Sequence, residues 1–288
     1  MCTPKPSAPF TLDKGMEIPS IPLVLIKIIQ ALDSDTSSAK ALEDLIMHDP
    51  ALSARILRLA NSAFYSFRAK VKTISHAIAL LGINLVTSLA IGNSIFDSFS
   101  RGAKSEAALI QQLWTHSCCV GVLAREAWSI NGFNKKEGEY VFICGLLHDI
   151  GKAILFKAYP NNYGAIFAAA KKESEPAIFS CEMENYGMDH AGIGALLAKQ
   201  WGFPEELASI IGRHHDPAAV EIPMVRMVMA ADLVAKELAI GYDGDEGRYE
   251  SADGLRRQID VPREISGQLV KFASRERENI EGFFRITS

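Results

Sequence analysis

Helical periodicity runs through most of this 288-residue chain and constrains its fold more than any other feature. Apolar residues recur every three to four positions, whereas the strict apolar–polar alternation of a half-buried strand is hard to find. Start and stop signals frame several of these segments, such as Asp49-Pro50 before one and Gly82 after another. The pattern predicts an all-α protein built from many short helices.

The expected helices form groups on either side of a plausible hinge at 100–104. Before the hinge they cover 18–32, 39–47, a segment from Pro50 to a break at Asn61-Ser62, 73–81 and 83–99. After it they cover 105–128, 137–149, 159–172, part of 182–201, 203–214, 223–238 and 262–284, with an acidic loop at 241–254. We therefore expect an N-terminal helical subdomain over residues 12–99, a second helical domain over residues 105–240 and a C-terminal helical extension over residues 255–288.

Composition and charge exclude several classes of protein. Hydrophobic residues make up 48% of the chain, enough for a sizeable core, and the net charge of -4 gives no general attraction to nucleic acid or anionic membranes. No apolar stretch is long enough to span a bilayer, and the proline-rich N-terminus lacks the apolar core of a signal peptide. The five cysteines are odd in number and show no CxxC spacing, which favours a reducing compartment. We expect a cytoplasmic protein with no membrane partner.

An adjacent histidine and aspartate, His148 and Asp149, end the most apolar of the expected helices. Burying an ionised carboxylate is costly unless a cation or hydrogen bonds compensate for the lost water. Both side chains are good ligands for a divalent metal. The pair therefore indicates either a metal site for phosphate chemistry or the remnant of such a site kept for structure.

Other imidazoles and carboxylates occupy similar places, within the expected helices or at their ends. Each one alone is more often a hydrogen-bonded core residue, and a His-His pair can be a solvated helix terminus. Together they favour one or two divalent ions, because iron, manganese and nickel accept mixed imidazole and carboxylate ligands and a carboxylate can bridge two ions. The candidate metal ligands are His116, His148, Asp149, His190, His214, His215 and Asp232.

Lys152 follows Asp149 by one short turn. Its ammonium group can meet a phosphate oxygen, or it can be an ordinary surface lysine, and the sequence favours neither. Asp149 and Lys152 are accordingly the two candidates for a catalytic role.

Residues 146–152, Leu-Leu-His-Asp-Ile-Gly-Lys, resemble the signature of the HD superfamily of metal-dependent phosphohydrolases. Over roughly residues 12–238 the chain resembles an HDOD domain, the HD-related output domain of bacterial signalling proteins. The likeness also rests on 18–22, 48–52, 57–65, 74–82, 113–117, 189–190, 201–204, 214–217 and 230–232. It implies an all-α fold and a role in bacterial signal transduction or gene regulation.

The related HD-GYP phosphodiesterases imply how the candidate residues would share the ions. A core metal site would consist of His116, His148, Asp149 and Asp232. A second ion would bind His190, His214 and His215, and Lys152 would face the phosphate.

Two departures from the HD-GYP pattern limit what the resemblance implies. Gln112 stands where trinuclear members place a glutamate, so a third ion is not expected. The Gly-Tyr-Pro segment is absent after His215, so hydrolysis of cyclic di-GMP is not expected either.

Two functions of different classes remain open on the sequence. The first is a non-catalytic signalling module that binds a protein partner or a small phosphate-containing ligand. The alternative is an active phosphohydrolase that acts on a nucleotide or phosphate ester. Nucleic-acid binding is disfavoured by the negative net charge, and nothing in the sequence fixes an oligomeric state. We expect a solvated face for the basic cluster of Arg55, Arg58, Arg68, Lys70 and Lys72.

Overall fold

The computed structural model describes residues 39–61, 70–83, 86–87, 90, 107–169, 177–244 and 263–285. All regular secondary structure in these ranges is helical, which confirms the predicted all-α class. The helix predicted at 18–32, most of the one predicted at 83–99 and the hinge at 100–104 lie outside the described residues. Among the described helices, none combines the length and the hydropathy needed to cross a bilayer.

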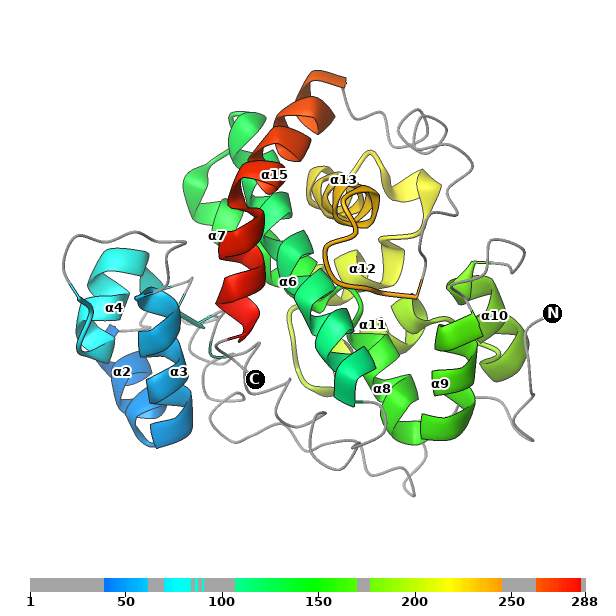
Figure 1. The fold of residues 1–288 in the computed structure, drawn as a ribbon, viewed down its shortest axis with the longest axis horizontal. Helices are drawn as coiled ribbons and strands as arrows, with labels where there is room; N and C mark the ends of the chain where they lie inside the picture. Colours follow the sequence, from blue (N-terminus) through cyan, green and yellow to red (C-terminus); the bar gives the residue numbers. More distant parts are fainter. Residues whose placement is uncertain are drawn as a thin grey trace.

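Three short helices, α2 (Ala39–Met47), α3 (Pro50–Ala60) and α4 (Ile74–Leu81), pack on one another at one side of the molecule (Figure 1). The start signal at Asp49-Pro50 acts as the sequence predicts, because Asp49 Oδ1 accepts a hydrogen bond from Leu52 N at 3.0 Å. Beyond the end of α3, Asn61 accepts from Val71 N at 2.8 Å and donates to Val71 O at 2.7 Å. This paired contact holds the segment before α4 against the end of α3.

Thr73 caps the N-terminus of α4, and we expect Thr73→Ala to lower the free energy of unfolding by about 1 kcal/mol. The Thr73 hydroxyl accepts from His76 N at 3.1 Å, so alanine would leave one backbone donor of the first turn without this partner. Urea denaturation followed by circular dichroism measures the loss. Thr73→Ser keeps the acceptor and should retain most of the stability. Equal losses for alanine and serine would contradict the capping role.

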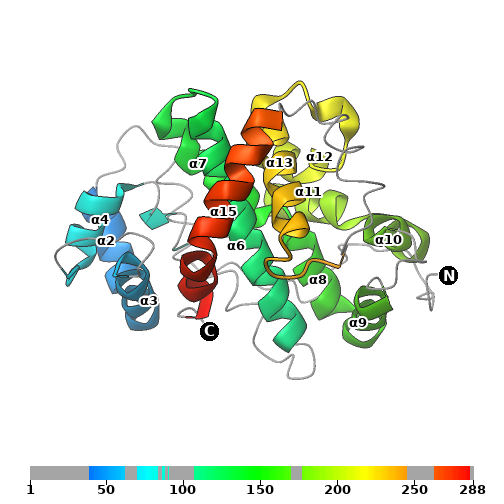
Figure 2. The same ribbon diagram turned by 45° about the horizontal axis from the view of Figure 1, so that its top comes forward.

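The larger group of helices surrounds α6 (Ala107–Ile130), which packs against α7 (Lys135–Leu147), α13 (Pro223–Glu237) and α15 (Arg263–Arg285) (Figures 1 and 2). The remaining helices lie beyond these: α8 (Ile150–Ala158), α9 (Pro160–Ala169), α10 (Ile178–Tyr186), α11 (His190–Gln200), α12 (Glu205–Arg213) and the 3₁₀ turn η1 (Pro217–Ala219). The division into domains at 12–99, 105–240 and 255–288 stays a prediction, because residues 91–106 and 245–262, where the boundaries fall, are not described.

One predicted helix boundary was wrong, and the error concerns two of the candidate ligands. The helix predicted over 137–149 ends at Leu147, so His148 and Asp149 form a turn before α8, a helix that the periodicity did not predict. The helical signal in 182–201 divides into α10 and α11 because Gly187 adopts a left-handed conformation at φ 73°. Asp189 then caps α11 by accepting from Gly192 N at 2.8 Å. His190 is therefore the first residue of a helix.

Candidate metal centre

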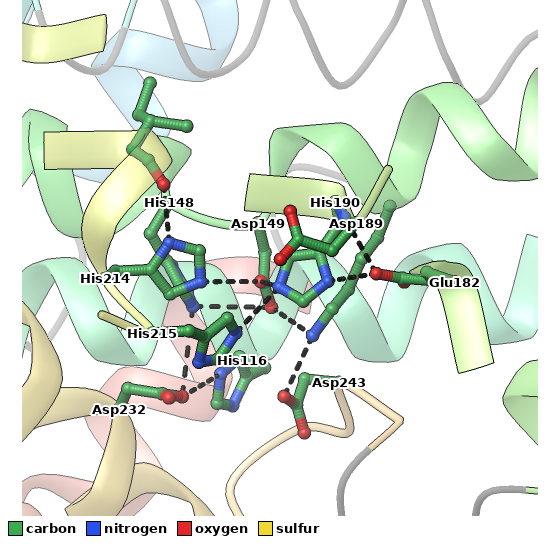
Figure 3. Close-up of polar contacts among 12 residues, drawn as sticks. His116, His148, Asp149, Glu182, Asp189, His190, His214, His215, Asp232 and Asp243 are labelled. Carbon is green, nitrogen blue, oxygen red and sulfur yellow. Dashed lines mark hydrogen bonds and ion pairs between the residues drawn. The ribbon is translucent and has the colours of Figure 1, made fainter. Parts of the chain in front are cut away.

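The structure brings all seven candidate metal ligands together from separate elements in the interior of the larger helical group (Figure 3). They come from α6, from the α7–α8 turn, from the start of α11, from the turn after α12 and from α13. Their donor atoms fall into groups in which every pair lies within 4.8 Å. One group contains Asp149, His190, His214 and His215, a second His116, His148 and Asp149, and a third His116, Asp232 and Asp243.

Asp149 lies at the middle of the cluster because the α7–α8 turn directs it inward. Its side chain is fully buried, and it belongs to two of the three groups. Its Oδ1 lies 3.2 Å from His190 Nε2 and 3.7 Å from His214 Nε2, while its Oδ2 lies 3.3 Å from His148 Nε2. The two oxygens of this carboxylate thus face different imidazoles.

Hydrogen bonds from the outer nitrogen to a backbone carbonyl orient two of the imidazoles. His148 Nδ1 donates to Gly145 O at 2.7 Å, and His214 Nδ1 donates to Ile211 O at 2.6 Å. A carbonyl oxygen can only accept, so in each neutral ring the proton sits on Nδ1 and the lone pair of Nε2 points toward Asp149. Metal-bound histidines are held by the same kind of partner on the far nitrogen.

Three atoms at the centre are buried without a hydrogen-bond partner: His148 Nε2, His214 Nε2 and Asp149 Oδ1. Buried polar atoms nearly always have a partner, and three electron-rich atoms that face one another repel. A divalent cation among them would satisfy all three at once. The donor set therefore fits a metal ion, with imidazole and carboxylate ligands of the kind that iron and manganese accept.

Glu182 on α10 positions His190, a role that no sequence pattern indicated. The fully buried carboxylate accepts from His190 N at 2.7 Å, from His190 Nδ1 at 2.6 Å and from Tyr163 Oη at 2.6 Å. Burial lowers the pKa of His190, but the negative charge of Glu182 outweighs it and raises that pKa to about 9. A metal at His190 Nε2 would therefore displace a proton.

Replacing Glu182 by glutamine should weaken metal binding by about 10- to 100-fold, the usual cost of losing the partner that orients a metal-bound histidine. Glutamine has one acceptor oxygen where the carboxylate has two, and its amide group would face buried donors. Competition with a chelator of known affinity measures the change. Glu184→Gln removes an exposed carboxylate from the same helix and should leave the affinity unchanged. Equal affinities for both variants would contradict the positioning role.

The charges around the centre keep its carboxylates ionised. Burial raises the pKa of Asp149, but its electrostatic interactions with His148 and Lys152 outweigh the effect of burial and hold the pKa well below its usual range. The pKa of Asp232 is lowered in the same way, chiefly by Lys236, against the opposing effect of its own burial. Burial also lowers the pKa of His214, to about 4, which keeps this ring neutral and able to bind a metal.

Lys152 is not the surface lysine that the sequence allowed as one alternative. Its side chain is fully buried, with Nζ 2.9 Å from Asp149 Oδ2 and 3.0 Å from Asp243 Oδ2. Asp243 was missed because it lies in the glycine-rich segment 241–254 that the sequence predicts to be a loop. The structure describes residues 241–244 of this segment, and these are not helical. Loops carry no periodicity, so no sequence pattern signals that one of their side chains turns inward.

Comparison with known proteins identifies the family. The model of the HDOD domain family matches residues 18–217, so the chain belongs to the HDOD family. The match includes six of the seven candidate ligands, while Asp232 lies beyond its end. The resemblance inferred from the sequence motifs is confirmed.

Three individual proteins are similar to this chain in sequence or in fold. An uncharacterized protein of Treponema pallidum (strain Nichols) is 29% identical over 239 residues, which are 78% of this chain and 44% of that protein, so the chain spans less than half of its length. The fold is similar to that of a Geobacter sulfurreducens HDOD domain protein with unknown function, with a TM-score of 0.76, 24% identity and 94% of both chains covered. A Shewanella amazonensis SB2B protein, provisionally named a phosphohydrolase, has a TM-score of 0.75 at 24% identity, with 94% of this chain and 96% of that chain covered. At this level of identity the two structures support the fold alone.

Proposed function

We propose that this HDOD protein is a bacterial, cytoplasmic signalling module that binds one or two divalent metal ions and acts through a protein partner or a small phosphate-containing ligand. The observation that supports metal binding is a set of three buried atoms without a hydrogen-bond partner, on His148, His214 and Asp149. These atoms lie inside a cluster of further candidate ligands. The core ion would be held by His116, His148, Asp149 and Asp232, and a second ion by Asp149, His190, His214 and His215. Iron, manganese and nickel are the expected metals.

Metal content tests this proposal directly. Protein expressed with added iron, manganese or nickel and then dialysed should retain about one to two equivalents of metal by elemental analysis, which the two predicted ligand groups would supply. A content well below one equivalent after every supplement would refute the metal-binding function.

The second candidate function is a phosphohydrolase that acts on a nucleotide or phosphate ester. It is favoured by Asp149, whose two oxygens face different groups of imidazoles, as a carboxylate that bridges two ions would. A bound ion would supply Lewis-acid activation of a phosphoryl oxygen and of water. In this function Asp149 would hold metal and Lys152 would contact the phosphate.

Two observations support the signalling module over the enzyme. The ammonium group of Lys152 already lies against two carboxylates, and the side chains of the core ligands are almost wholly buried. Metal-loaded protein tested on a broad panel of phosphate esters decides between them. Turnover that is abolished by His148→Ala would establish the enzyme. If a metal-containing protein turns over no ester, the signalling module is the function that remains.

A further inference from the structure

The loop after α13 places an additional carboxylate beside the metal centre. We call residues 238–244 the strap. Tyr242 fixes the strap at two points, since its N–H donates to Gln112 O on α6 at 3.2 Å and its hydroxyl donates to Phe167 O on α9 at 2.9 Å. Gly241 has a φ of 72°, and a Cβ there would collide with His116 N on α6. The strap therefore lies directly on the turn of α6 that carries His116.

Asp243 projects from the strap toward the centre (Figure 3). Two lysines contact it there. The same oxygen, Asp243 Oδ2, lies 3.0 Å from Lys152 Nζ and 3.0 Å from Lys236 Nζ. All three side chains are at most 4% exposed. Two ammonium groups that converge on one oxygen atom form the arrangement that an anionic oxygen of a ligand would meet.

Each lysine also contacts a candidate metal ligand. Lys152 Nζ lies 2.9 Å from Asp149 Oδ2, and Lys236 Nζ lies 2.8 Å from Asp232 Oδ2. The two lysines thus connect Asp243 to both carboxylates of the core site. An oxyanion that replaced the Asp243 carboxylate would lie beside the proposed metal positions. It would also keep both lysines paired with a negative charge, and a buried ammonium group is costly without such a partner.

We propose that Lys152 and Lys236 form an oxyanion-binding site for a phosphate group, and that Asp243 occupies this site as an internal competitor carried by the strap. The proposal deepens the function proposed above, because it places the phosphate of the small ligand next to the metal ions. Phosphate would bind only to molecules in which the Asp243 side chain has left the site between Lys152 and Lys236. The apparent affinity is then reduced by the fraction of molecules in that open state.

The base of the strap offers a means of control that lies away from the site. Arg277 on α15 donates to Leu238 O at 3.0 Å and to Ala239 O at 3.3 Å. Ala239 has a φ of 49°, a left-handed conformation that costs energy for a residue with a side chain and needs support from its surroundings. Loss of the Arg277 contacts should loosen the strap and favour its open state.

Titration calorimetry with inorganic phosphate, on the full chain with and without metal, tests the competition. Asp243→Asn keeps the size of the side chain and removes the competing charge. If the strap is open in about one molecule in ten or fewer, the variant should bind phosphate at least about tenfold more tightly than wild type. Glu221→Gln removes an exposed charge elsewhere and should bind like wild type. Unchanged phosphate binding in Asp243→Asn would overturn the proposal. A loss of bound metal without tighter phosphate binding would also overturn it, because that result would identify Asp243 as a metal ligand.

Hydrogen exchange in the wild-type protein provides a measurement that does not depend on how the variant folds. Phosphate should speed amide exchange in residues 240–244, where the Tyr242 amide is otherwise protected by Gln112 O. Arg277→Ala should strengthen the effect. Exchange that slows or stays constant as phosphate saturates the protein would refute the displacement of the strap. Faster exchange and tighter phosphate binding in a protein that holds no metal would instead uphold the oxyanion site and refute the metal-binding function.

Discussion

Asp149→Asn is expected to abolish the stabilisation that bound metal gives to the folded protein. A ligand that binds only the folded state adds about 2.7 to 4.1 kcal/mol at free concentrations of 100 to 1,000 times its dissociation constant. Asp149 belongs to two ligand groups, so its loss removes a ligand from each. Asparagine keeps the volume and one oxygen, but it lacks the negative charge that makes a carboxylate a good ligand for a divalent ion.

Chemical denaturation of wild type and Asp149→Asn, each with metal and with chelator, measures the effect. For each protein it gives the increase in the free energy of unfolding that metal causes, and the two increases are compared. The variant should also be less stable than wild type in chelator, because Lys152 and His190 lose a charged partner. The decisive quantity is therefore the gain on adding metal, large for wild type and near zero for the variant. Glu221→Gln should retain the full gain. Equal gains in wild type and Asp149→Asn would exclude this carboxylate as a ligand.

Local signals in the sequence predicted the parts of the fold that depend on local interactions. The start of α3 at Asp49-Pro50 and the end of α4 at Gly82 each involve residues only a few positions apart. Helix α8, which the periodicity did not predict, shows where local signals fail. Seven of its nine residues, Ile150 to Phe156, are buried without a break, and only Lys157 is exposed. A helix buried on every side has no polar face, so its periodicity disappears.

The candidate ligands illustrate the same limit at the level of the site. His148 and Asp149 could be identified because two metal-binding residue types stand next to each other after an apolar run. Glu182 and Asp243 could not, because their roles depend on which helix faces meet. Glu182 on α10 reaches His190 at the start of α11 only because the chain turns at Gly187 between the two helices. Asp243 reaches Lys152 from 91 residues away in the sequence.

Gly151→Ala should destabilise the protein by about 3 kcal/mol or more, at the upper end of the usual cost of overpacking. Gly151 lies in the first turn of α8, directly against the first turn of α11. A Cβ at this position would collide with His190 O and would lie 2.8 Å from His190 C and 2.9 Å from Gly194 N. All three are backbone atoms, so no change of rotamer relieves the overlap and the two helices must separate.

That separation would also pull the metal centre apart, because His190 begins α11 and Asp149 immediately precedes α8. We therefore expect Gly151→Ala to lose bound metal as well as stability, by elemental analysis and urea denaturation. Gly138→Ala on α7 is the matched control, since its Cβ would make ordinary contacts, the nearest 3.5 Å from Trp128 Cδ1. That variant should keep its metal and gain up to about 1 kcal/mol from the better helix propensity of alanine. If Gly151→Ala melts like wild type and keeps its metal, the close packing of α8 on α11 is not what holds Asp149 and His190 together.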